Sequence, residues 1–206
     1  MPIRGSQTWR AAFVYNHEGH EGTRRFMNIS VFGGSQPKEG SPAYQRAYEL
    51  GKLLAEAGHI VLTGGYIGTM EAVSRGAAEA GGHVIGVTCD EIERWRPVKA
   101  NGWVKEEWRR EKLLERLHAL VEGCDAAIAL PGGPGILTEI ALTWNLMIIG
   151  AITPRPLILV GDGWQIIFDQ VYESFGEYIP ANQRELVQFA KDVNSAVGLL
   201  ESYASR

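Results

Sequence analysis

The amino-acid sequence predicts an α/β fold in which a doubly wound, mostly parallel sheet is covered by helices on both faces. From Met27 onwards, short apolar runs alternate with longer segments whose apolar residues recur at helical spacing. These runs are apolar throughout, which is typical of parallel strands buried on both faces. Three of the runs end in glycine-rich turns. With 206 residues, the chain is predicted to form a single domain over residues 27–206, preceded by an N-terminal extension over residues 1–26.

The predicted elements follow one another with few gaps. Strands are expected at residues 28–32, 59–62, 83–87, 125–130, 156–160 and 186–190. Helices are expected at residues 42–57, 69–80, 106–122, 135–149 and 164–175, with a last helix capped by Asp192. Ser41 and Pro42 suit the N-cap and the first position of the first helix, and Gly58 suits its end. The extension is expected to have some strand character at residues 11–15.

Residues 88–105 form the one irregular passage of the predicted domain, and Trp95 and Trp103 lie in it, with Trp108 just beyond. A loop of this length in a compact domain is usually functional. The tryptophans could stack on the ring of a ligand, and a contact between subunits is an equally good interpretation.

Glycine turns at residues 32–35, 63–65 and 131–135 follow the first, second and fourth predicted strands. The carboxyl ends of parallel strands meet at one edge of the sheet, where ligands bind at the point of strand-order reversal. A strand order of 3-2-1-4-5 places that point between Ser35 and the turn at 131–135. Each turn alone is explained by tight packing, but the three together favour a binding site. None matches a dinucleotide fingerprint or a P-loop, so the expected ligand is a nucleotide or a similar phosphate ester.

The turn at residues 131–135 leads directly into a helix, and this order of elements is a ready anion site, because free backbone N–H groups and the helix dipole favour negative charge. Glu139 lies near the start of the same helix. Its carboxylate would repel a phosphate at the same spot, so we expect it to serve an uncharged or cationic part of the ligand. A carboxylate that merely complements the helix dipole is the alternative.

Three segments resemble motifs of the Lonely Guy (LOG) family, whose members are also labelled lysine decarboxylase-like. PGGPGILTE at residues 131–139 resembles the PGG-x-GT-x-E-E signature of that family. VFGGSQP at 31–37 and TGGYIGTMEAVSRGAAEAGGHVIGV at 63–87 resemble its other motifs, in the form typical of a bacterial branch that also includes molybdenum-cofactor carrier-like proteins. The resemblance runs from about residue 27 to 203.

This resemblance implies a Rossmann-like nucleotide-binding domain that hydrolyses the N-glycosidic bond of nucleoside 5′-monophosphates, releasing a base and ribose 5-phosphate. The matching catalytic residues are Arg116 and Glu139. A carboxylate facing the ribose can stabilise an oxocarbenium-like transition state, and an arginine can hold a phosphate or a base. The residues three and four positions from Arg116 are not acidic, so any carboxylate partner must come from elsewhere in the fold. Glu71 is one candidate for that partner or for a ribose contact.

The turns and the resemblance together give a set of candidates for binding the phosphate or the nucleotide: Gly34, Ser35, Thr63, Gly64, Gly65, Gly68, Met70, Pro131, Gly132, Gly133, Gly135, Ile136 and Thr138. Two of them depart from the signature, because Ile136 replaces its threonine and Thr138 replaces its first glutamate. Phosphate binding by backbone amides should survive these changes better than catalysis. The alternative function is therefore a non-catalytic carrier of a phosphorylated ligand such as the molybdopterin cofactor, and a pure interaction domain is a third hypothesis.

Several other classes are disfavoured. The net charge of −4, with no basic tract, argues against nucleic acid as a partner, and no apolar run is long enough for a membrane span. Cys89 and Cys124 lack metal-ligand spacing and are expected to be reduced, buried thiols of a cytoplasmic protein. No metal and no cofactor are expected. The glycine turns hold no lysine for a Schiff base, which argues against a pyridoxal-phosphate decarboxylase. The family implies a homodimer, with Trp144 and Met147 on the helix that forms its interface.

Overall fold

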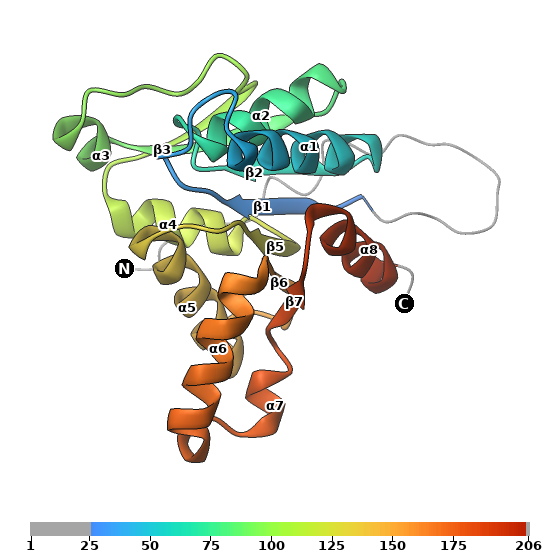
Figure 1. Cartoon of the computed structure of the whole chain (residues 1–206). Coiled ribbons are helices and arrows are strands. Elements are labelled where there is room, and N and C mark those ends of the chain that lie inside the picture. Colours follow the sequence, from blue (N-terminus) through green and yellow to red (C-terminus); the bar gives the residue numbers. More distant parts are fainter. Residues whose placement is uncertain (1–25, 205–206) are drawn as a thin grey trace.

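The computed structural model describes residues 26–204, which contain one seven-stranded sheet with the order β4-β3-β2-β1-β5-β6-β7 (Figure 1). The strands are β1 (Asn28–Phe32), β2 (Ile60–Thr63), β3 (Val84–Cys89), β4 (Glu106–Arg110), β5 (Ala126–Ala129), β6 (Leu157–Val160) and β7 (Gln188–Ala190). All neighbouring strands pair in parallel. The order reverses at β1, which lies between β2 and β5, so the predicted doubly wound fold and its 3-2-1-4-5 order are confirmed for the five central strands.

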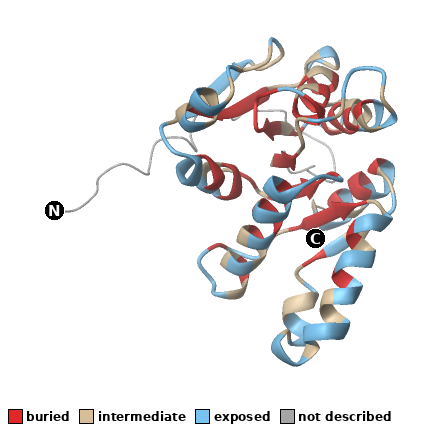
Figure 2. Cartoon of the chain, turned by 60° about the vertical axis from the view of Figure 1, so that its left-hand side comes forward, coloured by how far each residue is buried: buried red, intermediate tan, exposed pale blue. Residues whose placement is uncertain are grey.

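Helices cover both faces of the sheet. They are α1 (Pro42–Glu56), α2 (Thr69–Glu79), α3 (Asp90–Trp95), α4 (Leu113–Glu122), α5 (Pro134–Ile148), α6 (Asp162–Phe175), α7 (Ala181–Arg184) and α8 (Val193–Ala204), with a 3-10 turn, η1 (Gly176–Tyr178). Along β1, Ile29 and Val31 belong to the core shared with α1, α2 and α8, whereas Phe32 belongs to the core shared with α4, α5 and α6. The five central strands, β1, β2, β3, β5 and β6, are therefore almost entirely buried, as Figure 2 shows, which explains their continuously apolar sequences.

The predicted ends of α1 and the cap of α8 are confirmed. The Ser41 hydroxyl accepts a hydrogen bond from the Tyr44 N–H at 3.2 Å, and Pro42 is the first helical residue. Gly58 follows the end of α1 with a φ of +84°, a conformation that glycine adopts without strain. Asp192 caps α8 by accepting a hydrogen bond from the Ser195 N–H at 2.8 Å.

The prediction of one helix over residues 106–122 was wrong in its first part. Residues Glu106–Arg110 form β4, which pairs with β3 at the edge of the sheet, and α4 begins only at Leu113. The side chains of β4 are exposed or half-buried, so its sequence lacks the apolar run that marks the other strands. The Glu115 carboxylate accepts hydrogen bonds from the Lys112 and Glu111 N–H groups at 3.3 and 3.2 Å, which fixes the start of α4 after the strand.

The predicted strand character at residues 11–15 lies outside the described residues, and the division of the chain into an extension and a single domain stays a prediction. The passage at 88–105 is partly regular, since β3 continues to Cys89 and α3 follows directly. Among residues 26–204, no helix combines the length and the apolar character that crossing a membrane requires.

Candidate functional site

The first and second glycine turns pack against each other at the carboxyl edge of the sheet. The Thr69 N–H and hydroxyl groups both donate to the Gly34 carbonyl, at 2.8 and 3.1 Å. Gly68 has a φ of +77°, and a Cβ there would lie 2.4 Å from the same carbonyl oxygen. Any other residue at position 68 would force the two turns apart, so glycine is needed for their contact.

The third turn presents backbone without side-chain cover. Residues 131–135 are all exposed, Gly133 is the N-cap of α5, and Pro134 occupies the first helical position. Within residues 26–204, the amides of Gly132, Gly133, Gly135 and Ile136 have no acceptor. Free amides at the start of a helix of 15 residues form an anion site. Ile136 lies beneath this site: it is 3% exposed, and its Cδ1 would be only 2.2 Å from a Cβ at Gly132.

Arg116 reaches the second turn from the first half of α4 and is only 6% exposed. Its Nε donates to the Val87 carbonyl at 2.7 Å, and its Nη2 donates to the Gly64 carbonyl at 3.3 Å. The guanidinium carbon lies 5.7 Å from the centre of the Tyr66 ring. A Cβ at Gly64 would lie 2.1 Å from Nη2, so the absence of a side chain at this position makes room for the arginine. The guanidinium is therefore fixed in orientation before any ligand binds.

Glu139 faces the remaining nitrogen of Arg116. It is 7% exposed, and its Oε1 lies 3.9 Å from Arg116 Nη1, a distance that suits an ion pair but is too long for a hydrogen bond. Burial raises the pKa of Glu139 to about 7, against the opposing effect of the Arg116 charge. In the part of the chain that the structure describes, no group donates a hydrogen bond to this carboxylate. The pair thus combines a fixed cation with a carboxylate that is partly protonated at neutral pH and still able to accept hydrogen bonds.

The other predicted residues fall into two groups. Gly34, Gly64, Gly65 and Gly68 form the tight backbone of the first two turns, and Met70 is buried against Gly64. The hydroxyl group of Thr63 is engaged inside the protein, and that of the exposed Thr138 is engaged with its own helix. Thr63 Oγ1 accepts from the Gly65 N–H at 3.0 Å and pairs with Ser74 Oγ at 3.1 Å, and Thr138 Oγ1 donates to the Pro134 carbonyl at 2.9 Å. Neither hydroxyl points to an open ligand position.

Sequence reasoning missed Arg96, which follows α3 in the passage at 88–105. Its Nη1 donates to Ser35 Oγ at 3.3 Å and so connects that passage to the first turn. The passage is anchored beside the site by Tyr66, whose hydroxyl donates to the Cys89 carbonyl at 3.1 Å and accepts from the Cys89 N–H at 2.8 Å. No local pattern in the sequence signals either contact, because the partners are 61 and 23 residues apart.

The three tryptophans of the irregular passage have different surroundings. Trp95 is 79% exposed and lies beside Arg96, whose guanidinium carbon is 5.5 Å from the ring centre. Trp103 lies below Arg75, and Trp108 on β4 donates from Nε1 to Glu106 at 2.7 Å. Only Trp95, among these three, presents an open ring face next to the glycine turns.

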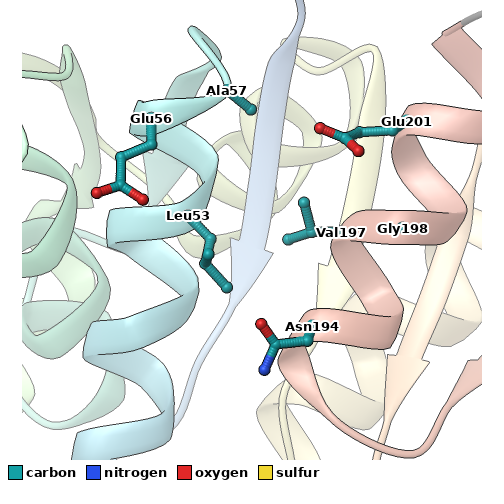
Figure 3. Close-up of a pocket in the computed structure, with 7 residues that line it drawn as sticks. All are labelled: Leu53, Glu56, Ala57, Asn194, Val197, Gly198 and Glu201. Atoms are coloured by element: carbon teal, nitrogen blue, oxygen red, sulfur yellow. The ribbon is translucent and has the colours of Figure 1, made fainter.

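A separate hollow of about 340 Å³ lies between α1 and α8 (Figure 3). Its lining includes Leu53, Val197 and the carboxylates of Glu56 and Glu201. It contains no glycine turn and none of the predicted site residues. Within residues 26–204, no group of three or more His, Cys, Asp and Glu side chains is arranged to hold a metal ion.

Residues 26–186 match the model of the SLOG cluster4 family. The chain belongs to that family. Among its relatives is the cytokinin riboside 5′-monophosphate phosphoribohydrolase LOG of Oryza sativa subsp. japonica, which is 33% identical over 187 residues, or 87% of this chain and 74% of that protein. LOG3 of Arabidopsis thaliana, with the same enzyme name, is 32% identical over 190 residues, or 87% of this chain and 84% of that protein.

Solved structures of the same shape include two proteins described by a different function. The molybdenum cofactor binding protein of the phototrophic bacterium Rippkaea orientalis matches with a TM-score of 0.68 and 25% identity, covering 87% of this chain and 98% of that one. The molybdenum cofactor carrier protein of Chlamydomonas reinhardtii matches with a TM-score of 0.67 and 26% identity, covering 88% of this chain and all of that one. The SLOG chain described here is thus similar in sequence to named hydrolases and in shape to named carriers.

Proposed function

We propose that this protein is a nucleoside 5′-monophosphate phosphoribohydrolase. The observation that carries the proposal is the buried Arg116–Glu139 pair, held at the carboxyl edge of the sheet next to an open set of backbone amides. A carboxylate opposes the charge of an anion, so Glu139 serves a part of the ligand other than its phosphate. A site that cleaves a sugar–base bond needs such a carboxylate, because positive charge develops on the sugar.

Different parts of the site bind different groups of the nucleotide. The free amides of the 131–135 turn hold the 5′-phosphate, and Glu139, one helical turn further on, faces the ribose. Arg116 keeps Glu139 partly ionised near neutral pH, because its charge opposes the effect of burial on the pKa. The 3.9 Å gap between the two side chains leaves each able to form a hydrogen bond with the ligand.

The reaction breaks the C1′–N bond, whose electron pair leaves with the base, and the departing nitrogen takes up a proton from the solvent. The oxygen of a water molecule bonds to C1′, and the proton that this water loses passes to the Glu139 carboxylate. Ionised Glu139 also stabilises the positive charge on the sugar while the bond breaks. Since the protonated carboxyl can do neither, the rate is expected to rise as pH increases through about 7.

Base release from AMP and from a cytokinin riboside 5′-monophosphate, followed by chromatography, tests this proposal. Glu139→Gln keeps the size of the side chain and is expected to reduce turnover at least about 100-fold while nucleotide binding persists. Glu173→Gln on α6 removes an exposed carboxylate and serves as the matched control. A wild-type protein that binds nucleotide but releases no base from any nucleoside monophosphate would exclude the hydrolase.

The second candidate is a non-catalytic carrier of a phosphorylated pterin. Two observations favour it: the departures at Ile136 and Thr138, and the similarity in shape to molybdenum-cofactor proteins. Mass spectrometry of gently purified protein separates the two candidates. A co-purified pterin together with no release of base supports the carrier.

We also infer a homodimer with an interface on the face formed by α5 and α6. Ile149 at the end of α5 and Ile166 on α6 are 66% and 67% exposed, and such apolar residues favour a contact between subunits. Trp144 and Met147 instead pack inside the subunit, against the core that α6 completes. Light scattering coupled to gel filtration measures the oligomeric state. A cytoplasmic location stays a prediction and agrees with the two free, buried cysteines, Cys89 and Cys124.

A further inference from the structure

A polar pocket of about 370 Å³ lies beside the first glycine turn, at the ends of α1 and α2 that adjoin the carboxyl edge of the sheet. It is separate from the Arg116–Glu139 pair, since neither residue lines it. The charged and hydroxyl side chains of the pocket come from four segments: Ser35, Lys38 and Glu39 from the turn after β1, Tyr44 from α1, Glu71 from α2 and Arg96 from the loop after α3.

Two buried polar atoms of this lining lack hydrogen-bond partners in the described part of the chain: Tyr44 Oη and Arg96 Nε. Tyr44 is only 3% exposed, and the nearby Arg75 guanidinium does not reach hydrogen-bond geometry with its hydroxyl, being engaged with Glu39 and Glu79. Leaving a buried polar group unpaired destabilises the folded protein. Such groups are rare in folded proteins, and both belong to residues that line this pocket, so a polar group that enters it can pair with them.

The unused hydrogen-bonding capacity of the pocket consists mainly of donors. Arg96 Nε is a donor only, and the Ser35 hydroxyl, which accepts from Arg96, has its own proton free to donate. No ion pair engages Lys38 among residues 26–204. Gly68 is the N-cap of α2, and the amides of Met70 and Glu71 in its first turn have no acceptor there. A ligand group that satisfies these donors must be rich in acceptors.

Two carboxylates of the lining, Glu39 and Glu71, oppose a negatively charged ligand. The Glu71 carboxylate also lines the pocket, and its charge, after burial, is the second cause that raises the pKa of Tyr44. Glu39 is held in an ion pair by Arg75, with 2.6 Å between its Oε1 and Arg75 Nη1, so Arg96 and Lys38 face a ligand against the one remaining carboxylate, Glu71. The charge of Glu71 lowers the affinity for an anion but does not prevent an anion from binding.

We propose that this pocket binds an oxyanion group, a phosphate or a carboxylate, through Arg96, Lys38 and Tyr44. The group is either a second acidic group of the ligand that reaches the Arg116–Glu139 pair or a free phosphate. A single ligand can reach both sites because one short loop, residues 64–68, contacts both. The Gly64 carbonyl accepts a hydrogen bond from Arg116, and Gly68 packs on Ser35 of the polar pocket. The assignment concerns binding alone, and it stands whether or not the protein releases a base.

Titration calorimetry with inorganic phosphate tests the pocket. Arg96→Gln is expected to raise the Kd at least about tenfold, in line with the loss of a charged hydrogen bond. Arg94→Gln, an exposed arginine of α3 outside the lining, removes the same charge and is expected to leave the Kd unchanged. Equal affinities for these two variants, or no binding of phosphate to the wild type at millimolar concentration, would overturn the proposal.

Glu71→Gln tests whether the ligand of this pocket is negatively charged. Removing its charge is expected to tighten phosphate binding several-fold, whereas a neutral heterocycle that donates to Glu71 would bind more weakly. Weaker phosphate binding by this variant contradicts the proposal. Tyr44→Phe deletes an unpaired hydroxyl, so it should weaken phosphate binding without lowering the unfolding temperature, which also guards against a misfolded Arg96 variant.

The exposed ring of Trp95, beside Arg96, reports where the phosphate binds. Phosphate is expected to change the tryptophan fluorescence of the wild type but not of Trp95→Phe, while calorimetry shows binding to both. The same fluorescence change in both proteins would place the phosphate elsewhere, at the 131–135 turn.

The two sources of the anion are separated with Glu139→Gln, in which turnover is blocked. If the pocket takes the second acidic group of a ligand, adenosine 3′,5′-bisphosphate binds more tightly than AMP, and the gain disappears in Arg96→Gln. If it takes free phosphate, AMP and inorganic phosphate bind together with neither affecting the other. A failure of the hydrolase proposal would appear only as the absence of base release and would leave these binding results intact.

Discussion

Replacing Glu139 with glutamine is expected to make the folded protein more stable at high pH and to leave it almost unchanged at low pH. The pKa of this carboxyl rises from 4.5 to about 7 on folding, mainly because of burial. The folded state therefore holds the proton more tightly than the unfolded state does. This contribution stabilises the fold below pH 4.5 and is lost as pH rises to 7. Each pH unit between these two pKa values changes the free energy of unfolding by about 1.4 kcal/mol. The wild type therefore loses about 3 kcal/mol of stability that Glu139→Gln keeps.

Urea denaturation of the ligand-free protein at several pH values from 4.5 to 8 measures this difference. The free energy of unfolding of Glu139→Gln, minus that of the wild type, is expected to increase by about 3 kcal/mol over the range. Glu173→Gln controls for the loss of one exposed negative charge. A difference that stays constant with pH would refute the reasoning, because it would mean that burial does not hold a proton on Glu139. A difference that falls with pH would mean that Arg116 outweighs burial.

Two further substitutions test how the site is held together. Gly64→Ala places a Cβ 2.1 Å from Arg116 Nη2, so it is expected to displace the guanidinium and to reduce the rate of base release at least about tenfold. Gly163→Ala is the control, because a Cβ there would meet nothing within 4 Å, and it should leave the rate unchanged. An unaltered rate in Gly64→Ala would contradict the positioning of Arg116. Tyr66→Phe removes both hydrogen bonds to the Cys89 backbone and is expected to lower the free energy of unfolding by about 1–3 kcal/mol in urea denaturation. Unchanged stability would mean that these bonds do not anchor the passage at 88–105.

The central fold could be predicted because its causes lie in the sequence, whereas the choice of Arg116 and Glu139 as a catalytic pair rested on the family resemblance. Continuous apolar runs identify the strands that are buried on both faces, and three glycine turns identify the edge at which those strands end. The lack of an acidic neighbour on its own helix required only that any carboxylate partner of Arg116 come from elsewhere in the fold. The structure places Glu139 at 3.9 Å, whereas the candidate Glu71 forms no ion pair with Arg116 among residues 26–204. These inferences depend on patterns that span only a few residues each.

The rest depends on contacts between distant parts of the chain. The segment Glu106–Arg110 carries four charged residues and one tryptophan, a composition that equally suits an exposed helix. Only its pairing with β3, opposite residues Ile85–Cys89, makes it a strand, and that partner is not visible locally. Arg96 was missed for the same reason, because its contact with Ser35 exists only once the loop after α3 folds back over the first turn.

The positions of Ile136 and Thr138 bear on the choice between hydrolase and carrier. The Ile136 side chain is buried beneath the third turn, against Gly132, so the amides above it remain free to bind a phosphate without the hydroxyl of the family threonine. Thr138 is exposed, and its hydroxyl is bonded to the Pro134 carbonyl. Both departures thus alter the rim of the site, whereas the Arg116–Glu139 pair inside it is complete. A buried carboxylate with a pKa of about 7 destabilises the folded protein at neutral pH, and a site that stabilises positive charge on a sugar makes use of that carboxylate. The buried pair therefore favours the hydrolase.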